Sequence, residues 1–385
     1  MRLGITTDCI HYRHADGRVG TENHILLRQF EQLAGHFTKT TIACAFATVD
    51  DSKVISWYTK DLNFIDLPVV GGMKFIDKIK ILIAFPKWIN SFIQIDKQSD
   101  IIYQRFPNNL NIPGFFYFYL KKKKVFATFT GTWFNYSGEP ITYRFQKWLL
   151  KRMFRGPVWV YTVEKENNIR IIPGFSPSYS QQEWDEESNQ VKDRIKSILM
   201  DGIPVLRLIT VGTLIFYKNQ LAIVNACAIL KSKGIPFKLK IVGDGPMFQE
   251  VKKSIKVLQL EKEVEMVGKK NYQDLKILYS QSDFVVQAPL KEGFGKVPIE
   301  GFFHGVIPIL NNLSMAGYMT GDEKRGFLFE NGDAELLAEK LMNIKNKISD
   351  LPLMIEEGRA FAKTQTLESW AKEYYETVSQ FYKIS

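Results

Sequence analysis

Short apolar runs alternate with stretches of helical period along the whole chain, and no other feature constrains the fold as much. Each run holds four to seven residues between turn residues, and amphipathic stretches with a period of 3.6 residues separate the runs. This order is typical of parallel sheets covered by helices. The predicted strands are 2–6, 40–46, 101–104, 124–129, 158–163, 205–211, 238–243, 264–267, 284–288 and 306–310.

The chain length and one polar stretch divide these strands into two sets. A chain of 385 residues is too long for one ordinary core and suits two domains. Residues 173–190, PGFSPSYSQQEWDEESNQ, are polar and rich in turn residues, which indicates a boundary. We therefore expect an N-terminal α/β domain at 1–185 and a C-terminal α/β domain that begins at residue 200.

Membrane spans, secretion and metal sites find no support in the sequence. No apolar run approaches the ~20 residues that span a bilayer, and Asp8 interrupts the N-terminus before a signal peptide could form. Cys9, Cys44 and Cys227 are scattered without metal-ligand spacing, as expected of reduced thiols that serve packing. These observations predict a cytoplasmic protein.

Positive charge is concentrated in the first half of the chain. Residues 101–155 carry ten basic side chains and one acidic side chain, which predicts an anionic surface as partner. No nucleic-acid recognition module accompanies this charge. Within 141–155, apolar residues such as Phe145 and Trp148 recur at helical spacing beside basic residues. This helix therefore either docks on the inner face of an anionic plasma membrane or packs into a core. The residues concerned are Phe145, Trp148 and Leu149, with Arg144, Lys147, Lys151, Arg152 and Arg155.

Three glycine-rich loops are predicted at the carboxyl ends of strands. In GRVGTENH, Gly17 and Gly20 precede an apolar helix face, and Gly35 is the expected stop of that helix. Two further loops are VGDGP at 242–246 and EGFGK at 292–296. A glycine loop that opens a helix after a strand is where doubly wound folds bind anions. One such loop can be a surface turn, but three together favour a phosphate-containing ligand.

The stretch EGFGKVPIE places two carboxylates around an expected helix start. Pro298 fits only the first helical turn, so the helix begins close to Gly295 and Lys296, where backbone N–H groups can hold an anion. Glu292 then lies in the loop, and Glu300 lies about one turn into the helix. A carboxylate accepts two hydroxyl groups well, so the pair suits a ligand with sugar on both sides of a pyrophosphate. That ligand is a nucleotide sugar.

These residues resemble a known family. Glu292 and Glu300, with seven residues between them, look like the glutamate pair of retaining GT-B glycosyltransferases. The group resembled is the large family 4, which includes many bacterial polysaccharide and lipopolysaccharide transferases. The resemblance continues in order through VGTLIFYKN, KLKIVGDGP, VEMVGK and YSQSDFVVQAP, over nearly the whole second half. GRVGTENH and FATFTGTW resemble the family more loosely.

The resemblance implies an α/β GT-B fold of two Rossmann-like doubly wound domains that face a central cleft. Residues 1–185 would form the acceptor-side domain, and residues 200–365 would bind the nucleotide sugar. TLESWAKEYYETV looks like the family's crossover helix, so residues 366–385 are expected to return to the N-terminal domain.

The resemblance also implies a role for each matching residue. Glu300 would hold the ribose hydroxyls and Glu292 those of the donor sugar, while Lys218 would contact the pyrophosphate. Backbone N–H groups of Gly295 and Lys296 would meet the phosphates. The implied catalytic residues are Glu292 and Lys218, and the implied donor-binding residues are Gly20, Thr130, Thr213, Lys218, Gly243, Gly268, Lys269, Glu292, Gly293, Phe294, Gly295, Lys296 and Glu300.

The implied activity is transfer of a hexosyl or deoxyhexosyl group from a nucleotide sugar to a glycan or lipid-linked glycan. It would proceed with retention of configuration, without cofactor or metal, with helix N-termini and lysine stabilising the departing nucleoside diphosphate. The chain departs from the family at two positions, because Thr213 stands where arginine is usual and Thr130 where histidine is usual. Arg105 or Arg18 are candidates for the missing cation.

Other classes of protein stay open beside the transferase. A sugar-nucleotide isomerase of GT-B architecture could share the phosphate loops. Because Thr213 and Thr130 differ from the residues usual in the family, a catalytically weakened nucleotide-sugar-binding protein is a further alternative. A glycosidase also needs two carboxylates, but it has no use for three phosphate-type loops.

Overall fold

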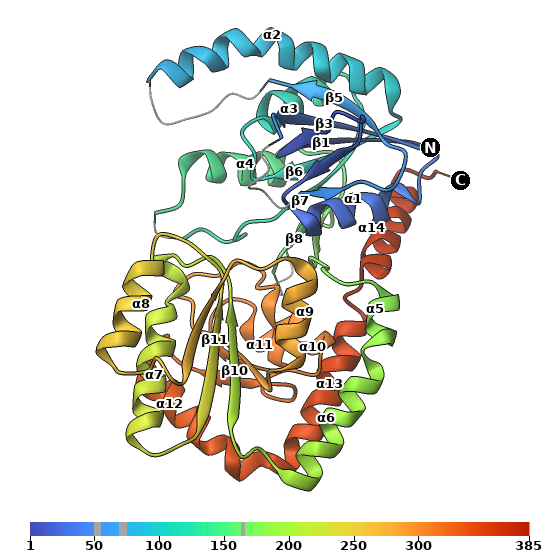
Figure 1. Cartoon of the computed structure of the whole chain (residues 1–385). Coiled ribbons are helices and arrows are strands. Elements are labelled where there is room, and N and C mark those ends of the chain that lie inside the picture. The colour runs from blue at the N-terminus through green and yellow to red at the C-terminus, as the bar shows by residue number, and fades with distance from the viewer. Residues whose placement is uncertain (50–54, 69–74, 137, 163–165, 385) are drawn as a thin grey trace. The chain divides into compact units, whose positions relative to one another are not determined.

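Two units, each built on its own sheet, make up the chain (Figure 1). The computed structural model describes residues 1–49, 55–68, 75–136, 138–162 and 166–384. The N-terminal unit holds Met1–Pro177 and Leu367–Ser385, and the C-terminal unit holds Ser178–Thr366. The C-terminal unit is therefore one continuous segment, whereas the N-terminal unit is assembled from two separate stretches of chain.

Parallel strands form most of the sheet in the N-terminal unit. β1 (Arg2–Arg13) pairs along its length with β3 (Lys39–Ala47), and its first half also pairs with β6 (Ile101–Phe106). Beside the second half of β1, β2 (Val19–Thr21) runs antiparallel. The parallel strands follow the order β5-β3-β1-β6-β7-β8-β9, as in a doubly wound fold. The remaining strands are β4 (Ser56–Trp57), β5 (Asn63–Leu67), β7 (Lys124–Phe129), β8 (Val158–Val160) and β9 (Ile171–Pro173).

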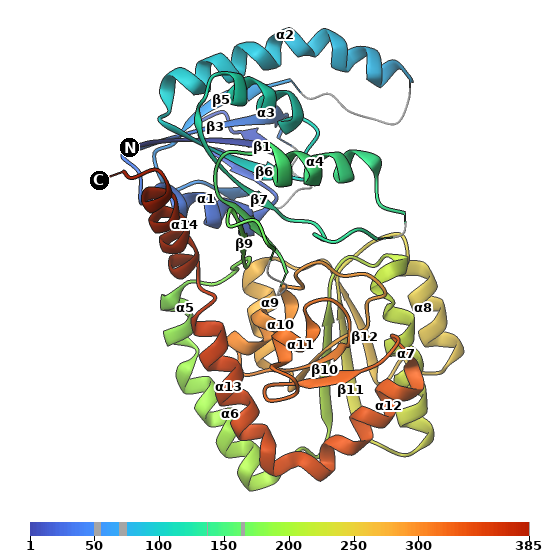
Figure 2. The ribbon, with the colours of Figure 1, turned by 180° about the vertical axis from the view of Figure 1, so that it is seen from behind.

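Helices cover both faces of this sheet, because successive strand residues point to opposite sides. Ile101 and Tyr103 pack in one cluster with α1 and α14, whereas Ile102 packs in another with α2, α3 and α4. Figures 1 and 2 show α2 and α3 on one side of the sheet and α1 and α14 on the other. These helices are α1 (His24–Ala34), α2 (Phe75–Gln98), α3 (Asn111–Leu120), α4 (Ile141–Arg152) and α14 (Leu367–Phe381).

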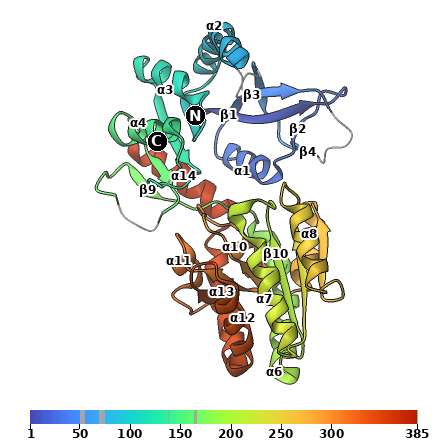
Figure 3. The same ribbon diagram turned by 90° about the vertical axis from the view of Figure 1, so that its left-hand side faces the viewer.

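The C-terminal unit contains a six-stranded sheet in which all described pairs are parallel, in the order β12-β11-β10-β13-β14-β15. Leu208 and Ile209 of β10 belong to two different core clusters, so helices pack on both faces (Figure 3). The strands are β10 (Leu206–Val211), β11 (Phe237–Val242), β12 (Val264–Gly268), β13 (Phe284–Gln287), β14 (Ile307–Asn311) and β15 (Phe327–Phe329). The helices are α5 (Gln181–Glu186), α6 (Ser188–Asp201), η1 (Phe216–Lys218), α7 (Gln220–Ser232), α8 (Phe248–Val257), α9 (Tyr272–Ser280), α10 (Val297–Phe303), α11 (Ala316–Thr320), α12 (Ala334–Asn343), η2 (Ile344–Asp350) and α13 (Leu351–Lys363).

Each of the ten predicted strands corresponds to a strand of the structure, with two notable differences in length. β1 extends from the predicted end at residue 6 to Arg13, because its second half pairs with β2 and β3. β8 ends at Val160, and residue 163 of that prediction lies outside the described residues. Five strands were not predicted, namely β2, β4, β5, β9 and β15, and each has only two to five residues.

The prediction of a glycine-rich loop directly before α1 is partly wrong. Gly17 lies in the turn between β1 and β2 with a φ of 89°, but Gly20 lies within β2. A Cβ atom added at Gly20 would lie 2.4 Å from the carbonyl oxygen of Ser56, because β4 pairs there. Asn23 caps α1 by accepting from the Leu26 N–H at 3.0 Å, and Gly35 follows the helix as predicted.

The boundary between the units lies at Ser178, earlier than the expected end of the first domain at residue 185. Trp184 explains this difference, because its carbonyl oxygen accepts from Arg359 of α13 at 2.7 Å and its ring lies under that guanidinium. From Ser178 onward, the turn-rich stretch that suggested the boundary therefore belongs to the C-terminal unit.

α4 presents two different faces. Leu149 and Leu150 are buried in the core, but Phe145 is 39 % exposed and Trp148 is 50 % exposed. Core packing therefore accounts for Leu149 and not for the two aromatic side chains. The prediction that Lys147 belongs to an exposed basic side of this helix is wrong. Lys147 is buried, with its Nζ 2.5 Å from the carboxylate of Glu139. Among the helices of the described residues, none is long and apolar enough to cross a membrane.

We predict that α14 stabilises the N-terminal unit mainly through Tyr374. Its ring stacks on Trp159 with centroids 3.8 Å apart, and its hydroxyl lies 2.9 Å from Thr128 Oγ1. Tyr374→Ala should lower the free energy of unfolding by about 3–5 kcal/mol, and Tyr374→Phe by about 1 kcal/mol. Urea denaturation followed by tryptophan fluorescence measures both. Phe381→Ala, an exposed position of the same helix, is the control, and an unchanged midpoint for Tyr374→Ala would refute the role.

Candidate functional site

The carboxyl ends of the strands in the C-terminal unit meet at one edge of the sheet. From β10 the chain proceeds to β11 and β12 on one side, then returns to β13 and continues to β14 and β15 on the other. The loops after β10 and β13 therefore leave neighbouring strands in opposite directions. Open α/β sheets bind ligands in the crevice at such a switch point.

Backbone contacts join the loops along this edge. The N–H of Gly212 donates to Val242 O at 3.0 Å, and the N–H of Gly243 donates to Gly268 O at 2.9 Å. Gly243 has a φ of 139°, and a Cβ atom there would lie 1.9 Å from Gly212 O. Only glycine permits this approach, so Gly243 holds together the loops after β10, β11 and β12.

Glu292 and Lys218 meet across the switch point. Lys218 ends η1 after β10, and its Nζ forms an ion pair with Glu292 Oε2 in the loop after β13. The other carboxylate oxygen of Glu292 accepts from the N–H of Gly293 at 3.0 Å. Both side chains are partly accessible, at 21 % and 23 % exposure. The two predicted catalytic residues therefore form one contact group that a ligand can reach.

Glu300 lies in the first turn of α10 and is buried, with 7 % of its surface exposed. Its Oε1 accepts from Ser178 Oγ at 2.9 Å, and its Oε2 accepts from the Tyr279 hydroxyl at 3.1 Å. Each oxygen keeps one further acceptor site, because a carboxylate oxygen has two lone pairs.

The segment between the two glutamates forms the turn into α10. Gly295 adopts a φ of 72°, Lys296 is the N-cap residue, and Pro298 lies in the first turn as the sequence predicts. Phe294 is buried under the loop, and the carbonyl oxygen of Gly293 accepts from Ser314 Oγ at 3.1 Å. The left-handed conformation of Gly295 reverses the chain, so that backbone N–H groups begin the helix beside Glu292.

Three more predicted donor-binding residues lie at the same edge of the sheet. Thr213 follows β10 and is exposed, while Gly268 ends β12 with a φ of 75° and Lys269 is exposed next to it. The Thr213 carbonyl oxygen accepts from Gln220 Nε2 at 3.2 Å, which fixes the start of α7. The C-terminal unit therefore brings eleven of the thirteen predicted residues to one edge of its sheet.

Gly20 and Thr130 belong to the N-terminal unit. Thr130 follows β7, and both its N–H and its Oγ1 bond to Phe106 O, at 2.7 and 3.1 Å. The two cations considered as substitutes also lie in this unit. Arg105 donates to Gln29 at 3.2 Å, and Arg18 donates to Asp16 at 2.8 Å.

Ser178 and Tyr279 contact Glu300 but were not predicted as site residues. They lie 122 and 21 positions from it in the sequence, so local spacing gives no indication of either contact. Tyr279 occurs in YSQSDFVVQAP, where its position at the end of a helix before a buried strand was the available signal.

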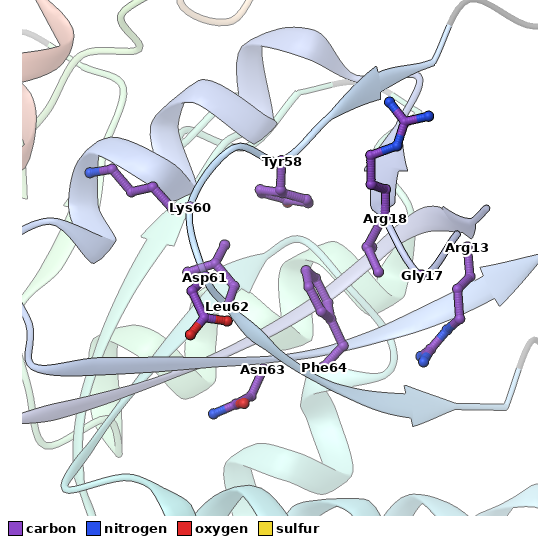
Figure 4. A pocket seen from close by; sticks show the side chains of 10 residues that line it. Arg13, Gly17, Arg18, Tyr58, Lys60, Asp61, Leu62, Asn63 and Phe64 are labelled. Atoms are coloured by element: carbon purple, nitrogen blue, oxygen red, sulfur yellow. The ribbon is translucent and has the colours of Figure 1, made fainter. Parts of the chain in front are cut away.

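A separate hollow of about 340 Å³ lies in the N-terminal unit (Figure 4). Figure 4 shows Lys60 at one end and Arg13 and Arg18 at the other, with Tyr58 and Phe64 between them. Carboxylates offset these cations: Asp66 pairs with Arg13, Asp16 pairs with Arg18, and Asp61 lines the hollow next to Lys60. The hollow thus offers little net positive charge for an anion.

The family comparison falls on the unit that carries the switch point. Residues 205–360, which include every strand of its sheet, match the family described as Glycosyl transferases group 1. The C-terminal unit contains a glycosyltransferase group 1 domain.

Relatives of the group 1 domain are named for polysaccharide biosynthesis. The capsular polysaccharide biosynthesis glycosyltransferase CapM of Staphylococcus aureus is 26 % identical over 197 residues, 51 % of this chain and 50 % of CapM. The amylovoran biosynthesis glycosyltransferase AmsK of Erwinia amylovora is 26 % identical over 166 residues, 42 % of this chain and 41 % of AmsK. The matched stretches span about a third to a half of the length of the curated relatives.

Similarity to solved structures extends beyond the group 1 domain to both units. The structure of HepE from Anabaena in complex with UDP and glucose has a TM-score of 0.70 and 14 % identity, and the match covers 99 % of this chain and 100 % of HepE. At this identity the match shows the fold alone. The predicted GT-B architecture of two Rossmann-like domains is confirmed.

We predict that Gly243→Ala disrupts the edge of the group 1 domain. The added Cβ would collide with Gly212 O, so the free energy of unfolding should fall by about 2–4 kcal/mol. Gly234→Ala is the matched control, because Gly234 has a φ of 67° but no atom within 4 Å of its would-be Cβ. It should cost only about 1–2 kcal/mol, and equal losses in thermal denaturation would contradict the close-approach explanation.

Proposed function

We propose that this chain is a retaining glycosyltransferase that uses a nucleotide-sugar donor. Its acceptor would be a glycan or lipid-linked glycan in surface polysaccharide or lipopolysaccharide biosynthesis. The observation that carries the proposal is the contact of Glu292 with Lys218 at the switch point, with Glu300 one turn into the next helix. The names of CapM and AmsK support the polysaccharide context.

Each residue has a role that its surroundings support. Glu300 accepts the two ribose hydroxyls through the remaining lone pairs of its carboxylate oxygens. Lys218 and the backbone N–H groups at Gly295 and Lys296 balance the negative charge that develops on the leaving nucleoside diphosphate. Glu292 accepts hydroxyls of the donor sugar. The reaction proposed needs no resident metal, because lysine and backbone N–H groups supply the positive charge.

Release of nucleoside diphosphate from a panel of nucleotide sugars tests the function. A transferase releases it much faster when a glycan acceptor is present, and the sugar appears on the acceptor. Equal release without acceptor indicates hydrolysis, and an altered sugar without release indicates an isomerase. Binding without either reaction indicates a non-catalytic nucleotide-sugar-binding protein.

We predict that Glu292→Gln lowers turnover at least tenfold but raises the affinity for nucleoside diphosphate about 2- to 5-fold. The variant lacks the carboxylate that pairs with Lys218, and a partly exposed ion pair is worth about 0.2–1 kcal/mol. In the variant, Lys218 can contact the pyrophosphate without first breaking an ion pair with residue 292, so binding costs less free energy. Calorimetry with nucleoside diphosphates measures the affinity, and Glu339→Gln on the exposed side of α12 is the control. Reduced affinity in Glu292→Gln would contradict this role.

The exposed face of α4 suggests where the enzyme works. Ile141, Phe145 and Trp148 are 83 %, 39 % and 50 % exposed and recur at helical spacing, with the two aromatic rings stacked at 5.9 Å. Arg144 and Arg152 recur on the same side of α4 at helical spacing, and Arg155, Lys121 and Lys122 are further exposed basic side chains after α4 and after α3. Apolar and basic groups on one exposed face suit an anionic lipid surface. We therefore propose a cytoplasmic enzyme that binds peripherally to the inner face of the membrane, where a lipid-linked acceptor would be available.

We predict that the protein sediments with vesicles containing phosphatidylglycerol at low salt and that 0.5 M salt releases it. Each basic residue near such a surface contributes about 1 kcal/mol, and salt screens this attraction. The double variant Phe145→Ser/Trp148→Ser should bind at least tenfold more weakly, whereas Leu199→Ser, an exposed apolar position on α6, should not. Equal recovery of the wild type in the supernatant with neutral and anionic vesicles would rule out this docking.

A further inference from the structure

The carboxylate of Glu300 is held by two hydroxyl groups from distant parts of the C-terminal unit. Ser178 Oγ donates to one oxygen at 2.9 Å, and the Tyr279 hydroxyl donates to the other at 3.1 Å. Both contacts are buried. An ionised carboxylate only accepts hydrogen bonds, so both hydroxyls must donate, and their positions fix the rotation of the carboxylate plane.

Tyr279 is itself fixed by its surroundings. It is fully buried, and its ring stacks on His304 with centroids 5.5 Å apart and planes 10° from parallel. His304 in turn contacts Glu187 through Nδ1 at 3.1 Å and Tyr179 through Nε2 at 3.1 Å. Arg194 of α6 also donates to the carbonyl oxygen of Ser280, at 2.7 Å. The hydroxyl of Tyr279 therefore has little freedom to leave Glu300.

Ser178 is fixed in a different way, because it is the first residue of the C-terminal unit. Two residues later, Ser180 caps α5 through a reciprocal pair of hydrogen bonds with Glu183. The ring of Tyr179 stacks on Phe303 of α10 at 4.4 Å. The chain is thus anchored directly after Ser178, and α10, which carries Glu300, is part of that anchor.

Resting on the function proposed above, we propose that Ser178 and Tyr279 are positioning residues of the nucleotide site. They hold Glu300 so that each carboxylate oxygen offers one remaining lone pair, at the spacing of two neighbouring hydroxyls. The ligand group that matches this arrangement is a cis-diol, as in ribose. The pair therefore makes the site selective for ribonucleotides over nucleotides that lack these hydroxyls.

The test compares ribonucleoside diphosphates with their 2′,3′-dideoxy analogues by calorimetry. The probe is whichever of UDP, GDP, ADP or CDP binds the wild type most tightly, together with its dideoxy form. Tyr279→Phe and Ser178→Ala should each weaken binding of the ribonucleotide about 3- to 10-fold and change that of the dideoxynucleotide less than 2-fold. Equal weakening of both nucleotides, or no change in either, overturns the inference.

Two controls separate positioning from general damage to the fold. Tyr272→Phe removes a hydroxyl from the same helix, but that hydroxyl donates to Glu183 at 2.7 Å, so diol selectivity should be unchanged. Ser178→Thr keeps the hydroxyl and should restore selectivity relative to Ser178→Ala. In the background of Glu300→Gln, Tyr279→Phe should have no further effect on the ribonucleotide, because it acts through that carboxylate.

The outcomes also separate this inference from the proposed function. If Glu300→Gln abolishes diol selectivity but Tyr279→Phe and Ser178→Ala preserve it, the positioning role is overturned and the nucleotide site stands. If the wild type binds none of the four nucleotides, both proposals are overturned.

Discussion

Parallel pairing of β10 with β11 on one side and β13 on the other is the constraint on which the site depends. Strands that run in the same direction send their following loops to the same edge of the sheet, so Lys218 and Glu292 can meet although 74 positions separate them. At the same edge, the loops after β10 and β11 approach closely only because Gly243 lacks a side chain. The position of the charged pair therefore follows from strand direction and strand order, and not from the local sequence around either residue.

The carboxylates of two buried glutamates have partners of different kinds. The side chain of Glu139 has no exposed surface and lies 2.5 Å from the ammonium group of Lys147, so the two opposite charges form an ion pair. Glu300 is buried almost as deeply, but two neutral hydroxyl groups donate hydrogen bonds to it. Burying an ionised carboxylate costs several kcal/mol unless hydrogen bonds offset the loss of water. A site that retains such a group gains stability when a ligand supplies further donors.

The sequence predicted ten of the strands, the glycine-rich loops of the C-terminal unit and the start of α10, because each leaves a local signal. Pro298 indicated the first helical turn, which was enough to place Glu292 before it and Glu300 within it. The sequence did not indicate that Ser178 or Tyr279 contacts Glu300, because these contacts arise only after three separate segments fold together. Gly20 was misread because a glycine in a loop and a glycine crowded by a neighbouring strand look alike in a sequence. For α4, the helical spacing of apolar and basic residues indicated two faces but did not show which face packs against the core.

The division of the N-terminal unit between the two ends of the chain affects how the protein is made. Trp159 and Phe126 pack against α14, whose residues leave the ribosome after the whole C-terminal unit has been synthesised. At ~5–20 residues per second, that delay is on the order of tens of seconds. During this interval one side of the first sheet lacks its last helix, while the C-terminal unit, being continuous, can already fold. The N-terminal unit can therefore complete its core only after the C-terminal unit has been synthesised.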